Sequence, residues 1–542
     1  MNQQVSTAKV GTAKVSTAQV ITAKKWWTLA AVCAATFMLL LDITIVIVAL
    51  PDIQAGLHTS FSGVQWVVDA YALTLASVLL TAGSLADRYG RRLLFSIGLV
   101  VFTVGSLLCG VAQTSLMLIL SRSAQGVGGA ILFATSLALL AQTFHGKERG
   151  VAFGIWGAVT AVATGLGPVL GGIITTGIGW RAIFLVNLPI GVAALAVTRW
   201  RVDESKTPNA ARPDWAGFVV LTAGLVSLVY GLIRAGEISW TDTGTITCLA
   251  IAAVLLVAFV FVERRAVHPM FDLSLFRIPT FDGGLASAFA MNGSLFAMLL
   301  YLVLYLQDDL GYSALGTGVR LLTMTAGSLV AATIAGRLSS HMPVRWLIGP
   351  GLVLVGVGLL LMGGLTGTSS WTHLIPGFVV AGIGSGMVNP PLASTAVGVV
   401  PPQRSGMASG VNTTFRQIGI ATGIAAYGSI FASTLEHHLR NALAGTPALG
   451  QHLSAVAAAI QQGEAGRALA EVPPALRPTL VDAVHSSFAS TLNILLVVSA
   501  VLALVGAVCA LTLIRSKDFV ASHRPAPDPR PAEPEGAAAI PR

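Results

Sequence analysis

The stretch GSLADRYGRR, at residues 83–92, joins two long apolar runs and recurs in weaker form later in the chain. Residues 82–100 align without gaps on residues 335–353, an offset of 253, and both copies contain an Ala-Gly pair, a Leu, an Arg and a Gly-Leu-Val triplet. A second short match, GVG at 126–128 with GIG at 382–384, has an offset of 256. The chain therefore contains two related halves. The alternative is chance similarity between two glycine-rich apolar hairpins.

Apolar runs long enough to cross a bilayer surround both copies of this stretch. Only 10% of the 542 residues are charged and 54% are hydrophobic, whereas soluble chains carry about 25% charged residues. A spanning helix needs about 20 apolar residues. Fourteen such runs lie at 27–50, 66–85, 94–112, 116–141, 151–173, 181–199, 215–235, 245–262, 282–306, 316–336, 346–364, 373–398, 411–433 and 488–514. The sequence therefore predicts an all-α membrane protein with fourteen transmembrane helices.

Basic residues gather on one side of this predicted bundle. An even number of helices puts both termini on one side, which then also receives the basic loops at 88–92, 199–212, 264–277 and 337–345. The opposite short loops contain only Arg181. Because cytoplasmic loops are enriched in Lys and Arg, we expect both termini in the cytoplasm and the chain in the inner (plasma) membrane of a bacterium. The net charge of +9 belongs to these loops, so we expect no nucleic-acid partner.

The repeat and the helix count together predict the domain organisation. Helix 2 corresponds to helix 10 and helix 4 to helix 12, as expected for two parallel six-helix halves separated by an inserted pair. The predicted units are a disordered cytoplasmic tail at 1–26, an N-terminal six-helix bundle at 27–200, a linker helix pair at 215–262, a C-terminal six-helix bundle at 282–514 with an external loop at 434–487, and a disordered cytoplasmic tail at 515–542.

Four motifs resemble those of a known family. Residues 83–92 match the cytoplasmic signature of the major facilitator superfamily almost letter for letter, and the others are LDITIVIVALP at 41–51, RSAQGVGG at 122–129 and GPVLGG at 167–172. Together they are similar to the fourteen-helix drug:proton antiporters, although Ile47 stands where that group usually has Asn. The resemblance implies the major facilitator fold, with two six-helix bundles plus two extra linker helices.

The loop at 83–92 is interpreted as a conformational latch. Its two glycines permit close approach and a tight turn, and we expect Asp87 to pair with Arg416 and Arg91 or Arg92 to pair with Glu148. The alternative is a basic loop that only sets topology, for which Asp87 is unnecessary. The candidate latch residues are Gly83, Asp87, Arg88, Gly90, Arg91, Arg92, Glu148 and Arg416.

Asp42 and Arg122 form the candidate proton-coupling pair. Helix 4 enters near Leu116 and helix 1 leaves near Leu50, so the two charges lie at one depth, about 10–12 Å below the outer edge. Intramembrane charges are costly and mark functional sites, and a carboxylate beside an Arg could carry a proton. A permanent structural ion pair is the alternative.

Helix 5 carries small residues that resemble the antiporter motif of this family. Small residues let helices approach closely, and a proline bends the helix. The face could close one side of the pathway against ion leak, and ordinary tight packing is the alternative. Its residues are Gly157, Ala161, Gly165, Gly167, Pro168, Gly171 and Gly172.

These features predict a proton-coupled antiporter that exports small amphipathic drugs or metabolites by alternating access. We expect neither catalytic residues nor a metal or cofactor, and a primary pump is excluded because no P-loop motif is present. The partners would be protons, the lipid bilayer and a small amphipathic substrate, with the chain a monomer or weak homodimer. A proton-coupled symporter or a uniporter that imports a nutrient is the alternative, which helix 5 disfavours.

Substrate-binding residues are the least determined by the sequence. Helix 13 has no acidic residue at 411–432, which disfavours dications and favours neutral or singly charged apolar compounds. The candidate cavity residues are Asp69, Asn292, Tyr301 and Tyr305. The linker pair 215–262 carries no polar cluster at mid-membrane depth, so we expect it outside the core, facing lipid.

Overall fold

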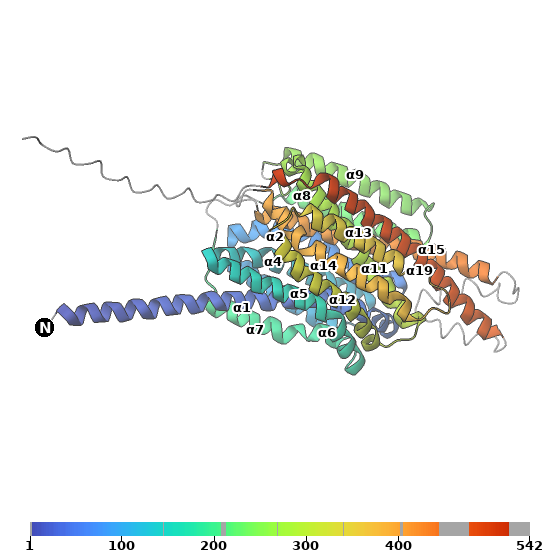
Figure 1. The fold of residues 1–542 in the computed structure, drawn as a ribbon, viewed down its shortest axis with the longest axis horizontal. Coiled ribbons are helices and arrows are strands. Elements are labelled where there is room, and N and C mark those ends of the chain that lie inside the picture. The colour runs from blue at the N-terminus through green and yellow to red at the C-terminus, as the bar shows by residue number, and fades with distance from the viewer. Residues whose placement is uncertain are drawn as a thin grey trace, which may run out of the picture.

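The computed structural model describes residues 3–519 apart from 145, 207–212, 268, 340, 401–404 and 444–475. Within these residues, thirteen helical segments are long and apolar enough to cross a membrane, and one shorter apolar helix, Arg345–Leu361, accompanies them. Each of the fourteen predicted spans coincides with one of these segments. The helices run side by side along one direction of the molecule (Figure 1). The chain is thus a multi-pass, all-α membrane protein.

The first half consists of six spans packed around α4. Its helices are α1 (Gln3–Leu57), α2 (Phe61–Tyr89), α3 (Arg91–Gly110), α4 (Ser115–Thr143), α5 (Gly146–Gly177), the short α6 (Ala182–Leu185) and α7 (Asn187–Arg201). Helix α4 packs against α2 and α3, and α1 packs against α5 and α7. The helix α1 begins at Gln3 and projects from the bundle (Figure 1), whereas the sequence predicted a disordered tail through residue 26.

The second half repeats this packing. Its elements are η1 (Leu273–Arg277), α10 (Pro279–Met291), η2 (Asn292–Phe296), α11 (Ala297–Leu304), η3 (Tyr305–Asp309), α12 (Ala314–Leu338), α13 (Arg345–Leu361), η4 (Trp371–Leu374), α14 (Ile375–Gly398), α15 (Ser405–Ala442), α19 (Arg477–Leu513) and η7 (Ser516–Asp518). Helix α14 packs against α12 and α13, as α4 packs against α2 and α3. The equivalences that the repeated stretch predicted are therefore reproduced by the packing.

The predicted external loop and C-terminal tail are only partly described. Helix α15 extends to Ala442 and α19 begins at Arg477, so the helices occupy both ends of the segment 434–487. The part at 444–475 lies outside the described residues. In the tail, η7 is described, and Asp518 accepts a hydrogen bond from the Thr280 hydroxyl at 2.7 Å; residues 520–542 lie outside the described part.

The linker pair α8 (Trp215–Glu237) and α9 (Thr243–Arg265) forms a hairpin on the outside of the bundle. Asp242 caps α9 by accepting from Thr245 N, and it pairs with Arg234 Nε at 2.9 Å. Both contacts hold the pKa of the Asp242 carboxyl below its usual value. Helix α8 covers α15 and α2, and α9 packs on α8 at the edge of the molecule (Figure 1). This matches the expected position, and contact with lipid stays a prediction.

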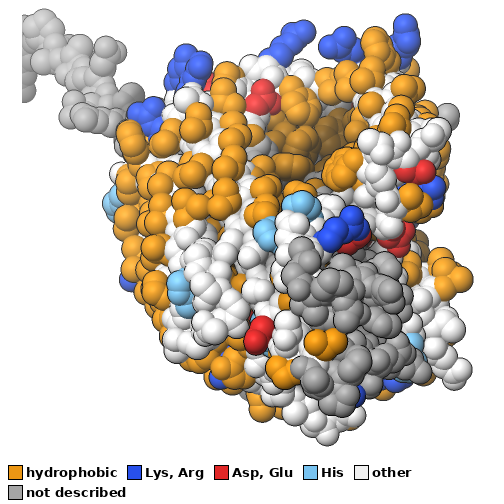
Figure 2. All heavy atoms as spheres, turned by 90° about the vertical axis from the view of Figure 1, so that its right-hand side faces the viewer, with side chains coloured by type: hydrophobic (Ala, Val, Ile, Leu, Met, Phe, Trp, Pro, Cys, Tyr) orange, Lys and Arg blue, Asp and Glu red, His pale blue; other side chains and the backbone are white. Residues whose placement is uncertain are grey.

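Large apolar side chains cover the flanks of the bundle. On α3 the exposed residues Leu93, Ile97, Val100 and Val104 recur every three or four positions, which aligns them on one helix face. Figure 2 shows hydrophobic side chains in columns along one flank, with few charged groups between them. Such a surface suits lipid rather than water.

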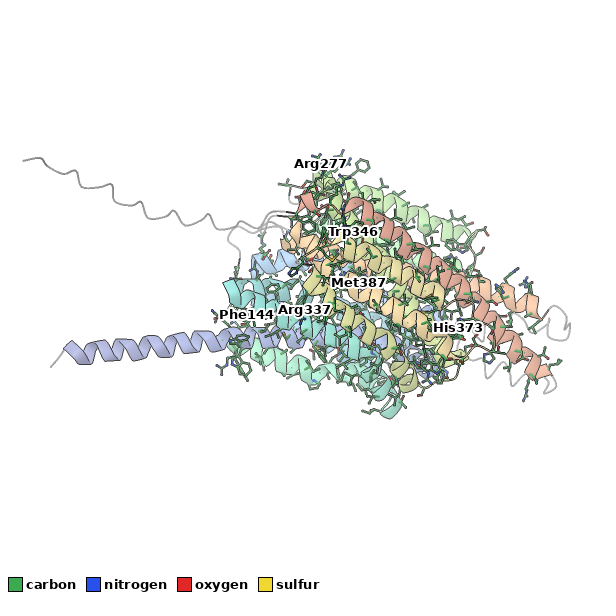
Figure 3. All side chains as sticks on the ribbon, viewed as in Figure 1. Phe144, Arg277, Arg337, Trp346, His373 and Met387 are labelled. Atoms are coloured by element: carbon green, nitrogen blue, oxygen red, sulfur yellow. The ribbon has the colours of Figure 1, made fainter. Side chains whose placement is uncertain are left out.

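Charged loops mark the ends of the helices. Arg277, Arg337 and Phe144 lie toward the end from which α1 projects, and His373 lies toward the other end (Figure 3). We name the first the basic end, because the loop at 87–92 also lies there, and the other the opposite end. At the basic end Gly90 has φ 126° between α2 and α3. This conformation favours glycine, and a Cβ there would lie 2.6 Å from the Glu204 carboxylate.

Candidate functional site

The predicted pair Asp42 and Arg122 lies within a buried polar cluster of the first half. Arg122 Nη1 donates to Asp42 Oδ2 at 2.6 Å and to Gln125 Oε1 at 2.7 Å. The other oxygen of Asp42 accepts from Gln125 Nε2 at 2.8 Å and from Asn187 Nδ2 at 3.1 Å. Helices α1, α4 and α7 therefore meet at one carboxylate. The depth argument brought the two charges together correctly, and their role in proton coupling stays a prediction.

This cluster, which we call the Asp42 cluster, is buried and has almost no solvent-exposed surface. Asp42 and Gln125 are 0% exposed and Arg122 is 1% exposed. The guanidinium lies over the Tyr71 ring, 4.2 Å from its centroid, and Nε donates to the Val67 carbonyl of α2 at 3.2 Å. A buried ion pair is stable only when further hydrogen bonds satisfy both partners, as they do here, and loss of one partner is strongly destabilising.

Sequence reasoning missed the neutral members of the Asp42 cluster. Gln125 lies within the motif at 122–129 that resembles the family, and its Nε2 also donates to Ser106 Oγ at 2.7 Å. The signal was available, because an ionised carboxylate can accept several hydrogen bonds and one Arg does not supply them all. A search for amides at the depth of Asp42 would have found both residues.

Asp69, on α2, is a second fully buried carboxylate with very different surroundings. It is 0% exposed, yet neither Oδ1 nor Oδ2 has a hydrogen-bond partner among the described residues. Burying an isolated ionised carboxylate costs far more than burying the neutral acid. This arrangement of helices therefore suits a protonated Asp69.

Asp69 lies beside a contact that joins the two halves. One turn away on α2, Gln65 Nε2 donates to Tyr301 Oη of α11 at 3.2 Å and to the Ile424 carbonyl of α15 at 3.1 Å. The Tyr301 hydroxyl donates to the same carbonyl at 2.7 Å and lies within electrostatic range of Asp69. A change of charge at Asp69 therefore acts directly on this interface.

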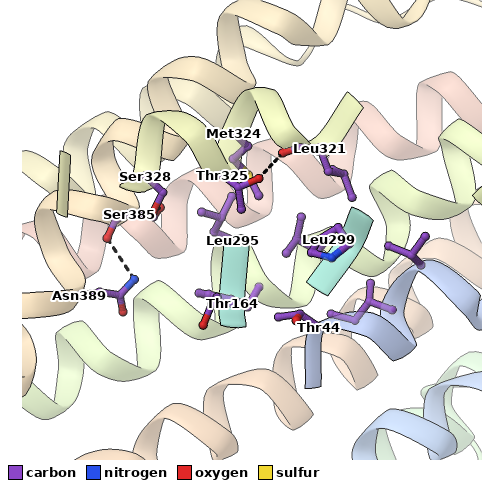
Figure 4. A pocket seen from close by; sticks show the side chains of 14 residues that line it. Thr44, Thr164, Leu295, Leu299, Leu321, Met324, Thr325, Ser328, Ser385 and Asn389 are labelled. Atoms are coloured by element: carbon purple, nitrogen blue, oxygen red, sulfur yellow. Dashed lines mark hydrogen bonds between the residues drawn. The ribbon is translucent and has the colours of Figure 1, made fainter. Parts of the chain in front are cut away.

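A cavity between the halves is the candidate substrate site. Its fourteen lining residues come from α1, α5, η2, α11, α12 and α14 and enclose about 650 Å³, including part of the opening. None of the described residues that line it is charged, and most are apolar. Ser328, Ser385 and Asn389 lie together at one end, and Leu299, Leu321 and Thr44 lie at the other (Figure 4).

The predicted substrate residues do not line this cavity. From the span Pro279–Asp309, the cavity is lined by Leu295, Phe296 and Leu299. Tyr301 lies two residues beyond Leu299, about 200° around the helix, and therefore turns toward α15. Asn292 Nδ2 donates a hydrogen bond to the Ala288 carbonyl, one turn back on the same helix, at 2.8 Å. Tyr305 Oη donates to the Ser369 carbonyl at 3.4 Å. Asp69 is likewise absent from the lining.

Helix α5 packs most closely on the second half toward the opposite end. A Cβ at Gly172 would lie 2.6 Å from the Ala314 carbonyl oxygen of α12, and one at Gly318 would collide with the Pro168 carbonyl. Gly167 and Gly171 approach α1 just as closely, so a Cβ at either position would collide with Thr44 or Ile45.

Toward the basic end α5 and α12 diverge. A Cβ at Gly165 would lie 3.9 Å from Thr325 Cγ2, and a Cβ at Gly157 would have no neighbour within 4 Å. The side chain of Ala161 lies outside the described residues. The gap toward the basic end is confined to α5 and α12, because α2 and α15 stay in contact there: Thr414 Oγ1 donates to the Ala76 carbonyl at 3.2 Å, and a Cβ at Gly410 would lie 2.7 Å from Leu80. The role of the α5 face in closing the pathway stays a prediction.

The predicted latch pairs are also different in the structure. Asp87 pairs with Arg91 at 2.7 Å, one turn away, and Glu148 pairs with Lys25 of α1 at 3.2 Å. Arg416 lies eleven residues into α15 from Ser405, which is about 16 Å from the basic end and too deep to meet Asp87 here.

The remaining latch residues fix the loop rather than cross between halves. Arg92 Nη1 donates to the Val202 carbonyl at 3.2 Å and lies 3.9 Å from the Glu204 carboxylate. Arg88 lies over the Tyr89 ring, and a Cβ at Gly83 would have no neighbour within 4 Å. Of the predicted pairs only Asp87 with Arg416 would join the two halves, and it is absent because Arg416 lies too deep in α15.

Comparisons with known proteins agree with this architecture. Residues 32–424 match the model of the Major Facilitator Superfamily. The multidrug resistance protein Stp of Mycobacterium tuberculosis is 38% identical over 421 residues, which cover 77% of this chain and 78% of that protein. The tetracenomycin C resistance and export protein of Streptomyces glaucescens is 32% identical over 492 residues, or 90% of this chain and 91% of that one.

A solved structure shares the fold. The crystal structure of a bacterial homolog to the human lysosomal transporter Spinster, in an inward-facing and occupied conformation, has a TM-score of 0.59 and 17% sequence identity. The match covers 92% of this chain and 98% of that chain. At this identity the comparison concerns the fold alone.

Proposed function

This chain belongs to the Major Facilitator Superfamily, whose members are transporters, and we propose from that premise that it exports small amphipathic compounds in exchange for protons. Relatives that are 32–38% identical are named as multidrug resistance and antibiotic export proteins. The observation that carries the proposal is the cavity between the halves, which is mostly apolar and lined by no charged residue. Sites for small molecules typically have this character, with a mostly apolar lining and a few polar groups that orient the ligand.

Asp69 is the proton carrier that the geometry favours. Its carboxylate is buried without a partner beside the Gln65–Tyr301 contact. Protonating Asp69 lowers the free-energy cost of closing the halves at the opposite end, because closure then buries no unpaired charge. Loss of the proton leaves an unpaired charge in the interface and favours its opening. Proton occupancy and the arrangement of the halves are thereby linked, as exchange requires.

Asp42, which the sequence suggested as the carrier, is better suited to hold the first half together. Its two oxygens accept from Arg122, Gln125 and Asn187. Protonating Asp42 would remove the charge that these donors stabilise and would leave Arg122 buried and unpaired. We therefore assign the Asp42 cluster a structural role and leave proton transfer to Asp69.

We infer from the positive-inside rule that the basic end lies in the cytoplasm, and we propose that the protein lies in the inner membrane of a bacterium. The halves meet at the opposite end through Gly172 and Ala314 and through Gln307, whose Nε2 donates to the Val48 carbonyl at 2.8 Å. The gap between α5 and α12 then faces the cytoplasm and gives a substrate a way in from the cytoplasm or the inner leaflet.

Everted membrane vesicles test the proposal. With the lumen acidified, an exported antibiotic added outside should raise the luminal pH as it enters in exchange for protons. A symporter that imports a nutrient would instead acidify the lumen on the same addition. Vesicles without the protein are the control. No protein-dependent change of luminal pH across neutral and singly charged antibiotics would contradict the proposal.

A further inference from the structure

Arg416 is an intramembrane cation for which the described residues provide no acidic partner. It lies deep in α15, its Nη1 donates to Asn389 Oδ1 at 3.2 Å, and its Nε donates to Asn412 Oδ1 at 3.3 Å. Both acceptors are neutral amides. No described carboxylate lies within salt-bridge distance of this guanidinium, in contrast to Arg122, which has Asp42.

The position of Arg416 connects it to the cavity. Asn389, which it contacts, lines the cavity together with Ser328 and Ser385. Figure 4 shows these three side chains together at one end, away from Leu299 and Leu321. Arg416 is partly exposed rather than fully buried. The cavity therefore has an apolar end and a polar end, with a guanidinium behind the polar one.

Charges inside a membrane are expensive and are retained where they bind something. Residues on α15 near Arg416 add hydrogen-bonding groups but no negative charge: Asn412, Thr413 and Gln417. A guanidinium presents several N–H donors in a planar fork, which fits carboxylate, sulfonate or phenolate oxygens. The five donors are not exhausted by the two bonds to Asn389 and Asn412.

We propose that Arg416 binds the anionic group of amphipathic substrates whose apolar body occupies the cavity. The inference rests on the proposed export function and narrows its substrates to compounds that are neutral or carry one negative charge. Asn389, which lines the cavity, accepts a hydrogen bond from the guanidinium and so connects Arg416 to the polar end of the cavity. When the substrate leaves at the opposite end, its anionic group also leaves the Arg416 guanidinium.

A matched pair of dyes tests this inference. Anilinonaphthalene sulfonate and its uncharged parent, N-phenylnaphthylamine, share one aromatic skeleton and differ by the sulfonate. Both become fluorescent in an apolar site. Purified protein in lipid nanodiscs is titrated with each dye, and the measured quantity is the ratio of the two dissociation constants in each variant.

Arg416→Gln should weaken sulfonate binding by roughly tenfold or more, the loss expected for a charge-assisted hydrogen bond. Binding of the uncharged dye should stay unchanged, which also reports a folded cavity. Arg416→Lys should retain part of the preference, because it keeps the charge and loses the fork. Arg320→Gln is the control, since Arg320 of α12 is stacked 3.4 Å from the centroid of Tyr312 and is not among the residues that line the cavity.

Equal weakening of both dyes in Arg416→Gln, or no weakening of the sulfonate dye, would overturn the inference. Recovery of sulfonate binding in the swap Asp87→Arg with Arg416→Asp would also overturn it, because a latch would then explain the loss. If the protein still exports neutral antibiotics in vesicles, only the anion site has failed. If no dye binds and no antibiotic is exported, the proposed function has failed with it.

Discussion

Asp42 and Asp69 are both 0% exposed carboxylates in the first half of the same protein, and they differ in everything that surrounds them. Asp42 accepts hydrogen bonds from three side chains, one of them a cation. Asp69 accepts none among the described residues and lies beside the interface between the halves. Burial alone therefore does not identify a proton carrier. A carboxylate with several hydrogen-bond donors, such as Asp42, keeps its charge, whereas a carboxylate without donors, such as Asp69, can gain and lose a proton.

The largest expected effect comes from breaking the Asp42 cluster. Asp42→Asn removes the counter-charge of Arg122 and should lower the free energy of unfolding by about 3–5 kcal/mol, as for other broken buried pairs. Thermal unfolding of the purified protein in detergent measures this. Asp52→Asn, an exposed carboxylate on the same helix, is the control and should unfold like the wild type. Equal stability of both variants would show that Asp42 does not need its charge.

Removing one neutral donor should have an intermediate effect. Asn187→Ala leaves Asp42 paired with Arg122 but takes away the bond at 3.1 Å, and it should cost about 1–3 kcal/mol in unfolding free energy. The same thermal assay applies, with Thr198→Ala on the same helix as a comparison for loss of a buried hydroxyl. A cost as large as that of Asp42→Asn would mean that Asn187, and not the ion pair, holds the cluster.

A smaller effect is expected at the interface beside Asp69. Gln65→Leu removes two hydrogen bonds between the halves, to Tyr301 and to the Ile424 carbonyl, each worth about 1 kcal/mol. Closure at the opposite end should weaken, so a cysteine at Ala314 should react faster with a water-soluble thiol reagent. Reaction at the wild-type rate would indicate that Gln65 does not stabilise this conformation.

The smallest effect on stability is expected at Asp69 itself. Asp69→Asn is the uncharged isostere of the protonated acid, so the unfolding free energy should change by less than about 1 kcal/mol. The identical substitution at Asp42 gives the largest loss, so one assay compares the two carboxylates directly. A loss at Asp69 equal to that at Asp42 would remove the distinction between them.

The sequence predicted the helices well because each span is read from local composition. All fourteen coincide with helical segments, and the depths of Asp42 and Arg122 follow from counting residues along two of them. The gapless repeat at 82–100 and 335–353 likewise predicted which helices would pack alike.

What the sequence did not predict depends on contacts between distant segments. The direction in which the Tyr301 side chain points depends on how its helix is rotated, and its span contains two π-helical segments, η2 and η3. The partners of Asp87 and Arg416 depend on whether the halves meet at the basic end, which differs between the states of an alternating-access protein. The amides Gln125 and Asn187 are uncharged, so the high cost of an intramembrane charge, which marks Asp42 and Arg122 in the sequence, does not mark them.

The most direct test of the account is proton release on substrate binding. Purified protein in weakly buffered detergent solution is mixed with uncharged N-phenylnaphthylamine, and a soluble pH indicator records protons released as the dye binds. The wild type should release protons in proportion to bound dye. Asp69→Asn should bind the dye and release none. Proton release by Asp69→Asn equal to that of the wild type would contradict the assignment of Asp69 as the carrier.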